Sequence, residues 1–176
     1  YQQEDAWTWE HQALTRARVV AGGARLQGEF EKIRHQVLIQ QRDLSELRAD
    51  VVSMRHKMRE HLGSKASVEK KAQIFNVKQD VGGIVDIEFM VQYAVLAWAH
   101  KAPNLTLFTD NVRILGELKS AGLISDEQNN ELVEAYKAYR SESHCLALQH
   151  QESVVDAALF TSERQAIEAI WQDWFS

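Results

Sequence analysis

The sequence predicts an all-α fold, an irregular bundle of about seven helices around one central apolar helix at about 84–100. Three observations support this prediction. The 176 residues contain only one proline, apolar residues recur at helical spacing, and the period-two alternation of strands is almost absent. Hydrophobic residues make up 45% of the chain and charged residues 26%, which are shares typical of a domain with a core. We therefore expect a single helical domain over 1–176.

Start and stop signals place the helices along the chain. In order, the predicted helices cover about 4–21, 24–40, 43–62, 84–100, 109–122, 125–150 and a last stretch from 162 onward. Glycines are expected to end the first and third helices, at Gly22-Gly23 and at Gly63. Residues suited to N-caps begin four later helices, and these are Asp43, Thr109 or Asp110, Ser125 with Gln128, and Ser162 with Gln165.

The third helix has one apolar face and several basic residues. Its apolar stripe is formed by Leu44, Leu47, Val51, Met54 and Met58. The basic residues are Arg48, Arg55, Lys57 and Arg59. We interpret these basic residues as the solvated side of the helix, opposite the stripe.

Residues 63–83 form the longest irregular segment, in which 73–78 alternate briefly and could be a short strand or an extended arm. A loop of this length in a compact domain is more often functional or mobile than accidental. The helix that follows is apolar nearly all round, which indicates that neighbours cover it.

The entrance to that helix reads Gly82-Gly83-x-x-Asp86-x-Glu88. Acids two positions apart lie on opposite faces of a helix, so a shared metal ion is disfavoured. Carboxylates in a first helical turn instead interact with the helix dipole, and these two could pair with Arg or Lys from another helix. A third reading makes the corner a phosphate-adjacent site, with Lys78 nearby in sequence. The structural reading and the phosphate reading both remain open.

The first helix carries Trp7, Trp9, Arg16 and Arg18. Arginines in such a helix could hold phosphate bidentately. Alternatively, they are surface residues whose stems cover apolar area.

Composition excludes several classes of function. A net charge of -5 makes nucleic acid an unexpected partner, and no apolar run is long enough to span a membrane. The scattered histidines predict no metal site. The one cysteine, Cys145, is expected to be a small buried filler in a reducing compartment.

Several segments together resemble bacterial glutamine synthetase adenylyltransferase. The resemblance extends from about Ala6 to Trp171 and Trp174, and so covers nearly the whole chain. The segments that carry it are 6–20, Met54-Arg55-x-Lys57-Met58, 82–89, 109–115, Ala135-Tyr136-x-x-Tyr139-Arg140 and 144–149.

The resemblance implies that this chain is the helical part that follows the adenylylating catalytic domain of a larger, multidomain enzyme. Such an enzyme resembles two nucleotidyltransferase modules in one chain. One module transfers AMP from ATP to a tyrosine of glutamine synthetase, and the other removes it by phosphorolysis. The family's metal-binding acids lie in the preceding catalytic domain, so neither a catalytic residue nor a metal ligand is expected here.

Further expectations follow from the same resemblance. ATP and Mg²⁺ are expected for the full enzyme, with no cofactor bound by this chain alone. The expected partners are the preceding nucleotidyltransferase domain, glutamine synthetase and the PII signal protein, and the expected location is cytoplasmic.

The resemblance also suggests roles for the candidate residues. Gly82, Gly83 and Asp86 are expected to line or brace the nucleotide cleft, with Arg16 or Lys78 near the ATP phosphates. Asp86 and Glu88 could instead anchor an interface between helices or domains. Two other functions stay open, namely an interaction module that docks glutamine synthetase or relays PII signals through 63–80, and a purely structural bundle.

Overall fold

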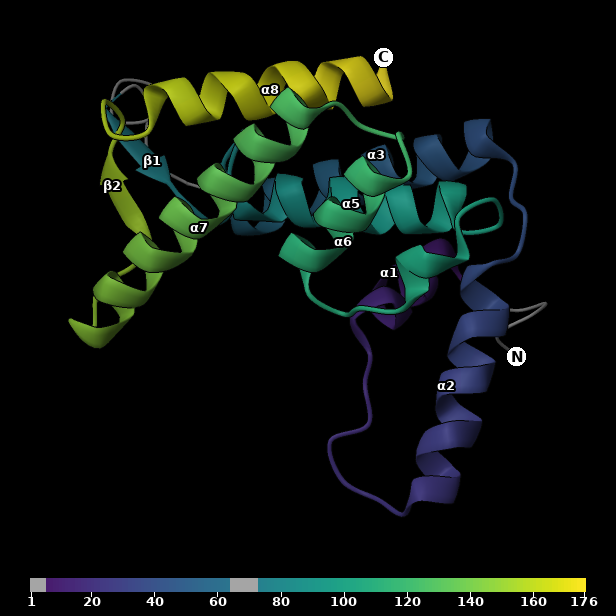
Figure 1. The fold of residues 1–176 in the computed structure, drawn as a ribbon. Coiled ribbons are helices and arrows are strands. Elements are labelled where there is room, and N and C mark those ends of the chain that lie inside the picture. The colour runs from purple at the N-terminus through teal and green to yellow at the C-terminus, as the bar shows by residue number, and fades with distance from the viewer. Residues whose placement is uncertain (1–5, 64–72) are drawn as a thin grey trace. The chain divides into compact units, whose positions relative to one another are not determined.

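The structure is a computed structural model that describes residues 6–63 and 73–176. Over these residues it contains seven α-helices, one short 3-10 helix and a single two-stranded sheet (Figure 1). The all-α prediction is therefore confirmed. The elements are α1 Thr8–Arg16, α2 Ala24–Leu38, α3 Leu44–Leu62, β1 Ile74–Asn76, α5 Ile84–Trp98, η1 Pro103–Thr106, α6 Asn111–Ser120, α7 Asp126–Leu148, β2 Val154–Asp156 and α8 Thr161–Phe175.

The chain divides into two compact units. The first contains the chain up to Val52 together with Val91–Ile124, and the second contains Ser53–Met90 with Ser125–Ser176. Of the three boundaries along the chain, one falls inside α3, one inside α5, and the third in the connection between α6 and α7. The expectation of one domain over the whole chain stays a prediction.

Helix α5 confirms the predicted apolar helix. Its residues are buried except for Glu88, Gln92 and Trp98, which are half-buried. An apolar surface on every side of a helix requires neighbours on every side, because each exposed apolar group would cost free energy in water.

A buried arginine connects separate segments of the first unit. Arg34 is 2% exposed and donates to the carbonyl oxygens of Leu14, Thr15, Thr106 and Phe108 at 2.5–3.3 Å. Its guanidinium thereby supplies a donor to carbonyls at the end of α1 and in and after η1, of which that of Leu14 also accepts from the N–H of Ala17.

The second unit contains the two-stranded sheet, whose strands come from distant parts of the chain. Strands β1 and β2 pair antiparallel, with Phe75 opposite Val155. The Phe75 ring is fully buried and packs edge-on against Tyr139, at 5.8 Å between centroids, while the Arg164 guanidinium lies 4.3 Å from its centroid. The expectation of a short strand within 73–78 is confirmed, whereas residues 64–72 of the same predicted loop lie outside the described residues.

Three of the predicted caps are confirmed. Asp43 accepts from the backbone N–H groups of Ser45 and Glu46, and Asp110 accepts from that of Arg113. Ser125 and Gln128 form the predicted capping box.

Two predicted helix ends are wrong. Helix α1 ends at Arg16 rather than near residue 21, and Ala17 is already extended. The physical reason is Arg34, whose guanidinium takes the last carbonyls of α1. At α8 the capping box from Ser162 is wrong, because the helix begins one residue earlier, after Phe160 in the left-handed conformation with φ 66°.

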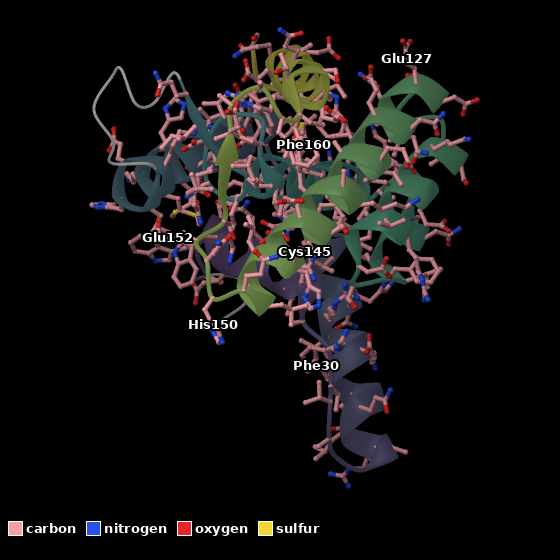
Figure 2. All side chains as sticks on the ribbon, turned by 90° about the vertical axis from the view of Figure 1, so that its left-hand side faces the viewer. Phe30, Glu127, Cys145, His150, Glu152 and Phe160 are labelled. Carbon is pink, nitrogen blue, oxygen red and sulfur yellow. The ribbon has the colours of Figure 1, made fainter. Side chains whose placement is uncertain are left out.

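Cys145 corrects another expectation. It is exposed near the end of α7 (Figure 2), not buried as predicted. The last turns of α7 stay uncovered, and Leu148 keeps 70% of its surface exposed. Helical periodicity alone therefore misplaced this residue in the core.

Candidate functional site

The corner before α5 is built on two glycines. Gly82 has φ +78°, and a Cβ there would lie 2.9 Å from the backbone oxygen of Arg164 in α8. A Cβ on Gly83 would lie 2.7 Å from the backbone oxygen of Val77. Both contacts are closer than real Cβ atoms tolerate, so glycine is required here by backbone packing within the second unit.

A tight turn connects β1 to this corner. The Asn76 side-chain oxygen accepts from the N–H groups of Lys78 and Gln79. The Asp80 carboxylate accepts from the N–H of Asn76 at 2.8 Å, and the carbonyl of Val77 accepts from the N–H of Ile84 at 2.9 Å. Asn and Asp side chains favour such turns because they supply the acceptors that the backbone lacks locally.

Asp86 is the centre of the site, and it is 1% exposed. Its Oδ1 accepts from Arg55 Nε at 2.5 Å and from Arg59 Nη2 at 3.1 Å. Its Oδ2 accepts from the N–H of Gly82 at 2.7 Å. The expectation that this acid pairs with a basic residue of another helix is confirmed.

Arg55 is the residue that sequence reasoning misplaced. It was assigned to the solvated side of the third helix, but it is fully buried and also donates to the carbonyl of Gln79 at 2.7 Å. Burial lowers the pKa of its guanidinium from the ordinary value, and the attraction of the Asp86 carboxylate opposes this. Its spacing was the available signal, because Arg55 continues the row of Leu47 and Val51 at steps of four.

Arg59 was assigned to the same solvated side, but its side chain is only partly exposed to solvent. Its side chain keeps 26% of its surface exposed while its Nη2 contacts Asp86. The prediction of a solvated basic face is therefore wrong for Arg55 and incomplete for Arg59.

Glu88 points to a different neighbour. The Tyr136 hydroxyl donates to its Oε1 at 3.3 Å, whereas Asp86 contacts the arginines of α3. The two acids thus have separate partners, as helical geometry predicts. Across 6–63 and 73–176, no group of three His, Cys, Asp or Glu side chains is arranged to hold a metal ion.

The other candidates are distributed between the units. Lys78 is exposed and belongs to the second unit, where it lines an open pocket with His61, Asn76 and Ser153. Arg16 is exposed and ends α1 in the first unit. The second unit thus brings Lys78 into the corner with the two glycines and the two acids, and Arg16 belongs to the other unit.

The charged groups of the corner stabilise the fold rather than take part in a reaction. Both oxygens of Asp86 already accept hydrogen bonds, so neither is free to bind a metal ion or take a reacting proton.

In the described part of the chain, no helix combines the length and apolar character needed to cross a bilayer. The fold and the site together define a helical domain whose buried charges support its structure.

Comparison with known proteins identifies the family. A family model described as GlnD PII-uridylyltransferase matches residues 52–172. A second, described as Glutamate-ammonia ligase adenylyltransferase, matches residues 1–33. The chain belongs to the family of the first model, and its segment 1–33 is similar to the second.

Curated relatives match nearly the whole chain. Bifunctional glutamine synthetase adenylyltransferase/adenylyl-removing enzyme from Pseudomonas aeruginosa is 52% identical over 180 residues, which cover 98% of this chain. The enzymes of the same name from Pseudomonas putida and Acinetobacter baylyi are 52% and 51% identical over 97% and 98% of it. The predicted resemblance to glutamine synthetase adenylyltransferase is thereby confirmed. The chain spans 18% of the length of each of these relatives.

Proposed function

We propose that this chain is the helical segment of a bifunctional glutamine synthetase adenylyltransferase, and that it braces the nucleotide cleft of a separate catalytic domain. The observation that carries the proposal is the use of Asp86. Its two oxygens accept from Arg55, Arg59 and Gly82, so the acid that most resembles a catalytic metal ligand stabilises the corner instead. Relatives at 51–52% identity along nearly all of the chain supply the enzyme class.

In this proposal the catalytic acids, ATP and Mg²⁺ belong to the preceding nucleotidyltransferase domain. The corner residues Gly82, Gly83, Asp86 and Glu88 hold β1, α5 and their neighbours in place. The described residues do not fit a Mg²⁺ site, so no chemical step is assigned to this chain. Glutamine synthetase and the PII protein are the proposed partners of the whole enzyme, and the cytoplasm is its proposed location.

The exposed cations carry the part of the proposal that concerns the nucleotide. Lys78 and Arg16 are both exposed and could contact the phosphates of ATP bound in the neighbouring domain. A charged hydrogen bond to phosphate contributes about 1.5–3 kcal/mol, so its loss is expected to raise the KM for ATP by about 10- to 100-fold.

The test uses the full-length enzyme that contains this chain. Lys78→Ala and Arg16→Ala are compared with Arg25→Ala, which removes an exposed arginine paired with Glu29 on α2. Steady-state AMP transfer to glutamine synthetase gives the KM for ATP. Because Arg25 lies on α2, Lys137→Ala is a second control, which removes an exposed cation paired with Glu134 on α7. A raised KM in either variant but not in the controls supports nucleotide contact. An unchanged KM in both variants refutes that contact, and if binding to glutamine synthetase is weakened as well, the interaction-module function takes its place.

A further inference from the structure

The first ten residues of α2, here called the α2 arm (24–33), differ from the rest of the first unit. None of them is buried. Burial in this helix begins at Arg34 and continues with Val37 and Leu38. The stretch 17–23 that leads into the arm is likewise free of buried residues (Figure 1). The arm is therefore a helix that the described residues do not cover.

The arm nevertheless has an apolar face. Leu26, Phe30 and Ile33 are spaced at i, i+4 and i+7, which places them along one side of the helix. Leu26 is 61% exposed and Ile33 is 54% exposed, while Phe30, labelled on the same helix in Figure 2, is half-buried. Val20, in the segment before the arm, is 84% exposed. An apolar stripe at helical spacing is typical of a face that another element covers.

Helix energetics indicate that a cover is missing. Isolated helices shorter than about 12–15 residues are marginal in water even with good helix formers. The arm also contains Gly28, which costs about 1 kcal/mol relative to alanine in a helix. A Cβ at Gly28 would meet nothing within 4 Å, so contacts with the described residues do not explain the glycine. The helical arm is thus weakly supported by its own sequence.

The family matches indicate what covers it. The adenylyltransferase model matches residues 1–33 and ends where the exposed arm ends. The other model begins at residue 52. The arm thus lies in the part of the chain that is similar to the adenylyltransferase model, and the relatives extend well beyond the 18% of their length that this chain matches.

We propose that the apolar face of the α2 arm, formed by Leu26, Phe30 and Ile33, docks onto the part of the same enzyme that the adenylyltransferase model describes and that lies outside these 176 residues. This inference rests on the proposed function, because it needs the chain to be part of that enzyme. It deepens that function by naming the surface through which the helical segment contacts its neighbour.

Hydrogen–deuterium exchange on the full-length enzyme tests the docking. Amides 24–33 of a covered arm are expected to exchange about 100-fold more slowly than unstructured peptide, since packed helices open only with a free-energy cost. Exchange within about tenfold of the unstructured rate, with Arg34–Leu38 protected, would overturn the proposal. Protection that disappears on dilution would also overturn it, because the cover would then be a second copy of the enzyme.

Matched variants locate the contact on one face. Leu26→Ser and Ile33→Ser are expected to speed exchange across the arm roughly tenfold, because each removes apolar contact with the cover. Gln27→Ser and Lys32→Ser change exposed residues beside the stripe and are expected to change exchange less than about threefold. Equal effects from both pairs would contradict docking through the stripe.

The two proposals fail in different ways. Exchange in the unmodified enzyme is measured whether or not the variants fold. An active AMP-transferring enzyme with an unprotected arm would refute the docking alone. A well-folded enzyme with a protected arm but without AMP transfer would refute the proposed function and leave the contact in place.

Discussion

Removing the Asp86 carboxylate tests the structural role of the corner. Asp86→Ala leaves Arg55 with a positive charge, no exposed surface and, among the described residues, only the Gln79 carbonyl as a hydrogen-bond acceptor, beside the Phe89 ring 6.0 Å away. Breaking a buried ion pair by removing one member typically costs about 3–5 kcal/mol. Arg59 adds little to this loss, because its side chain is 26% exposed and water can solvate it. We therefore expect a loss of about 4 kcal/mol in the free energy of unfolding, dominated by Arg55.

Urea denaturation measures the effect. With a slope of about 2 kcal/mol per molar urea, the midpoint should fall by roughly 2 M. Asp173→Ala is the control, since Asp173 is an exposed acid of α8 whose side chain accepts a 3.3 Å hydrogen bond from the exposed Gln128 amide. The control should change stability by no more than about 0.5 kcal/mol.

A double variant tests whether the loss of stability comes from leaving Arg55 unpaired. Arg55→Met with Asp86→Leu removes both charges, and replacing a buried pair by apolar residues is often neutral, so most of the stability should return. The reasoning is refuted if Asp86→Ala costs less than about 1 kcal/mol while AMP transfer by the full-length enzyme collapses. That result would make Asp86 a functional group rather than a structural one.

Three further changes test other parts of the fold. Gly82→Ala should lower the free energy of unfolding by about 3 kcal/mol, because the new Cβ meets the Arg164 backbone. Gly122 also has a positive φ, +68°, but nothing lies within 4 Å of its Cβ position, so Gly122→Ala should lower it by about 1 kcal/mol. Thermal melts measure both changes. Burial raises the pKa of the Tyr139 phenol, so folding stability should fall as pH rises above the unfolded value of about 10. The Tyr139 hydroxyl has no hydrogen-bond partner among the described residues. Tyr139→Phe should therefore leave the free energy of unfolding nearly unchanged at about pH 7 and should remove its decline above about pH 10, as urea denaturation below and above the unfolded phenol's pKa of about 10 can show. Arg34→Met should lower the free energy of unfolding by at least about 3 kcal/mol in urea denaturation, since four carbonyls lose the guanidinium as a donor and, of these, that of Leu14 still accepts from the N–H of Ala17. Lys32→Met, at an exposed position, should not.

Local signals predicted the features that depend on neighbours in sequence. The caps at Asp43, Asp110 and Ser125 act within three residues, and each was found. Helix α5 was found because its apolar run is long and complete. These elements are determined by residues close together in sequence, which is the range over which sequence patterns are informative.

Features that depend on distant residues were missed. The end of α1 is determined by Arg34, about twenty positions later. Arg55 is buried because Asp86, 31 positions away, supplies its counter-charge, and a basic residue without a visible partner is naturally assigned to the surface. Strand β2, three residues long, was not predicted because it exists only through its pairing with β1.

For the candidate site, the sequence predicted a glycine-dependent corner and a paired acid, but not the identity of the partner. Asp86 with a basic residue of another helix was foreseen, whereas Arg55 was placed in solvent. Only the folded backbone shows why Gly82 and Gly83 are needed, because the atoms they approach belong to Arg164 and Val77. The roles of Arg16 and Lys78 near a nucleotide stay predictions.

The two compact units alternate along the chain, and each is made of two separate stretches. A single cut in the gene therefore cannot yield both units whole, because one unit needs the chain up to Ile124 and the other begins at Ser53. Synthesis from the amino terminus completes the first unit before the second, whose strand β1 must wait for a partner about 80 positions later. Closing a loop of that length costs about 4 kcal/mol of chain entropy. The two units must therefore be encoded and synthesised together, and neither can be transferred to another protein as one continuous segment.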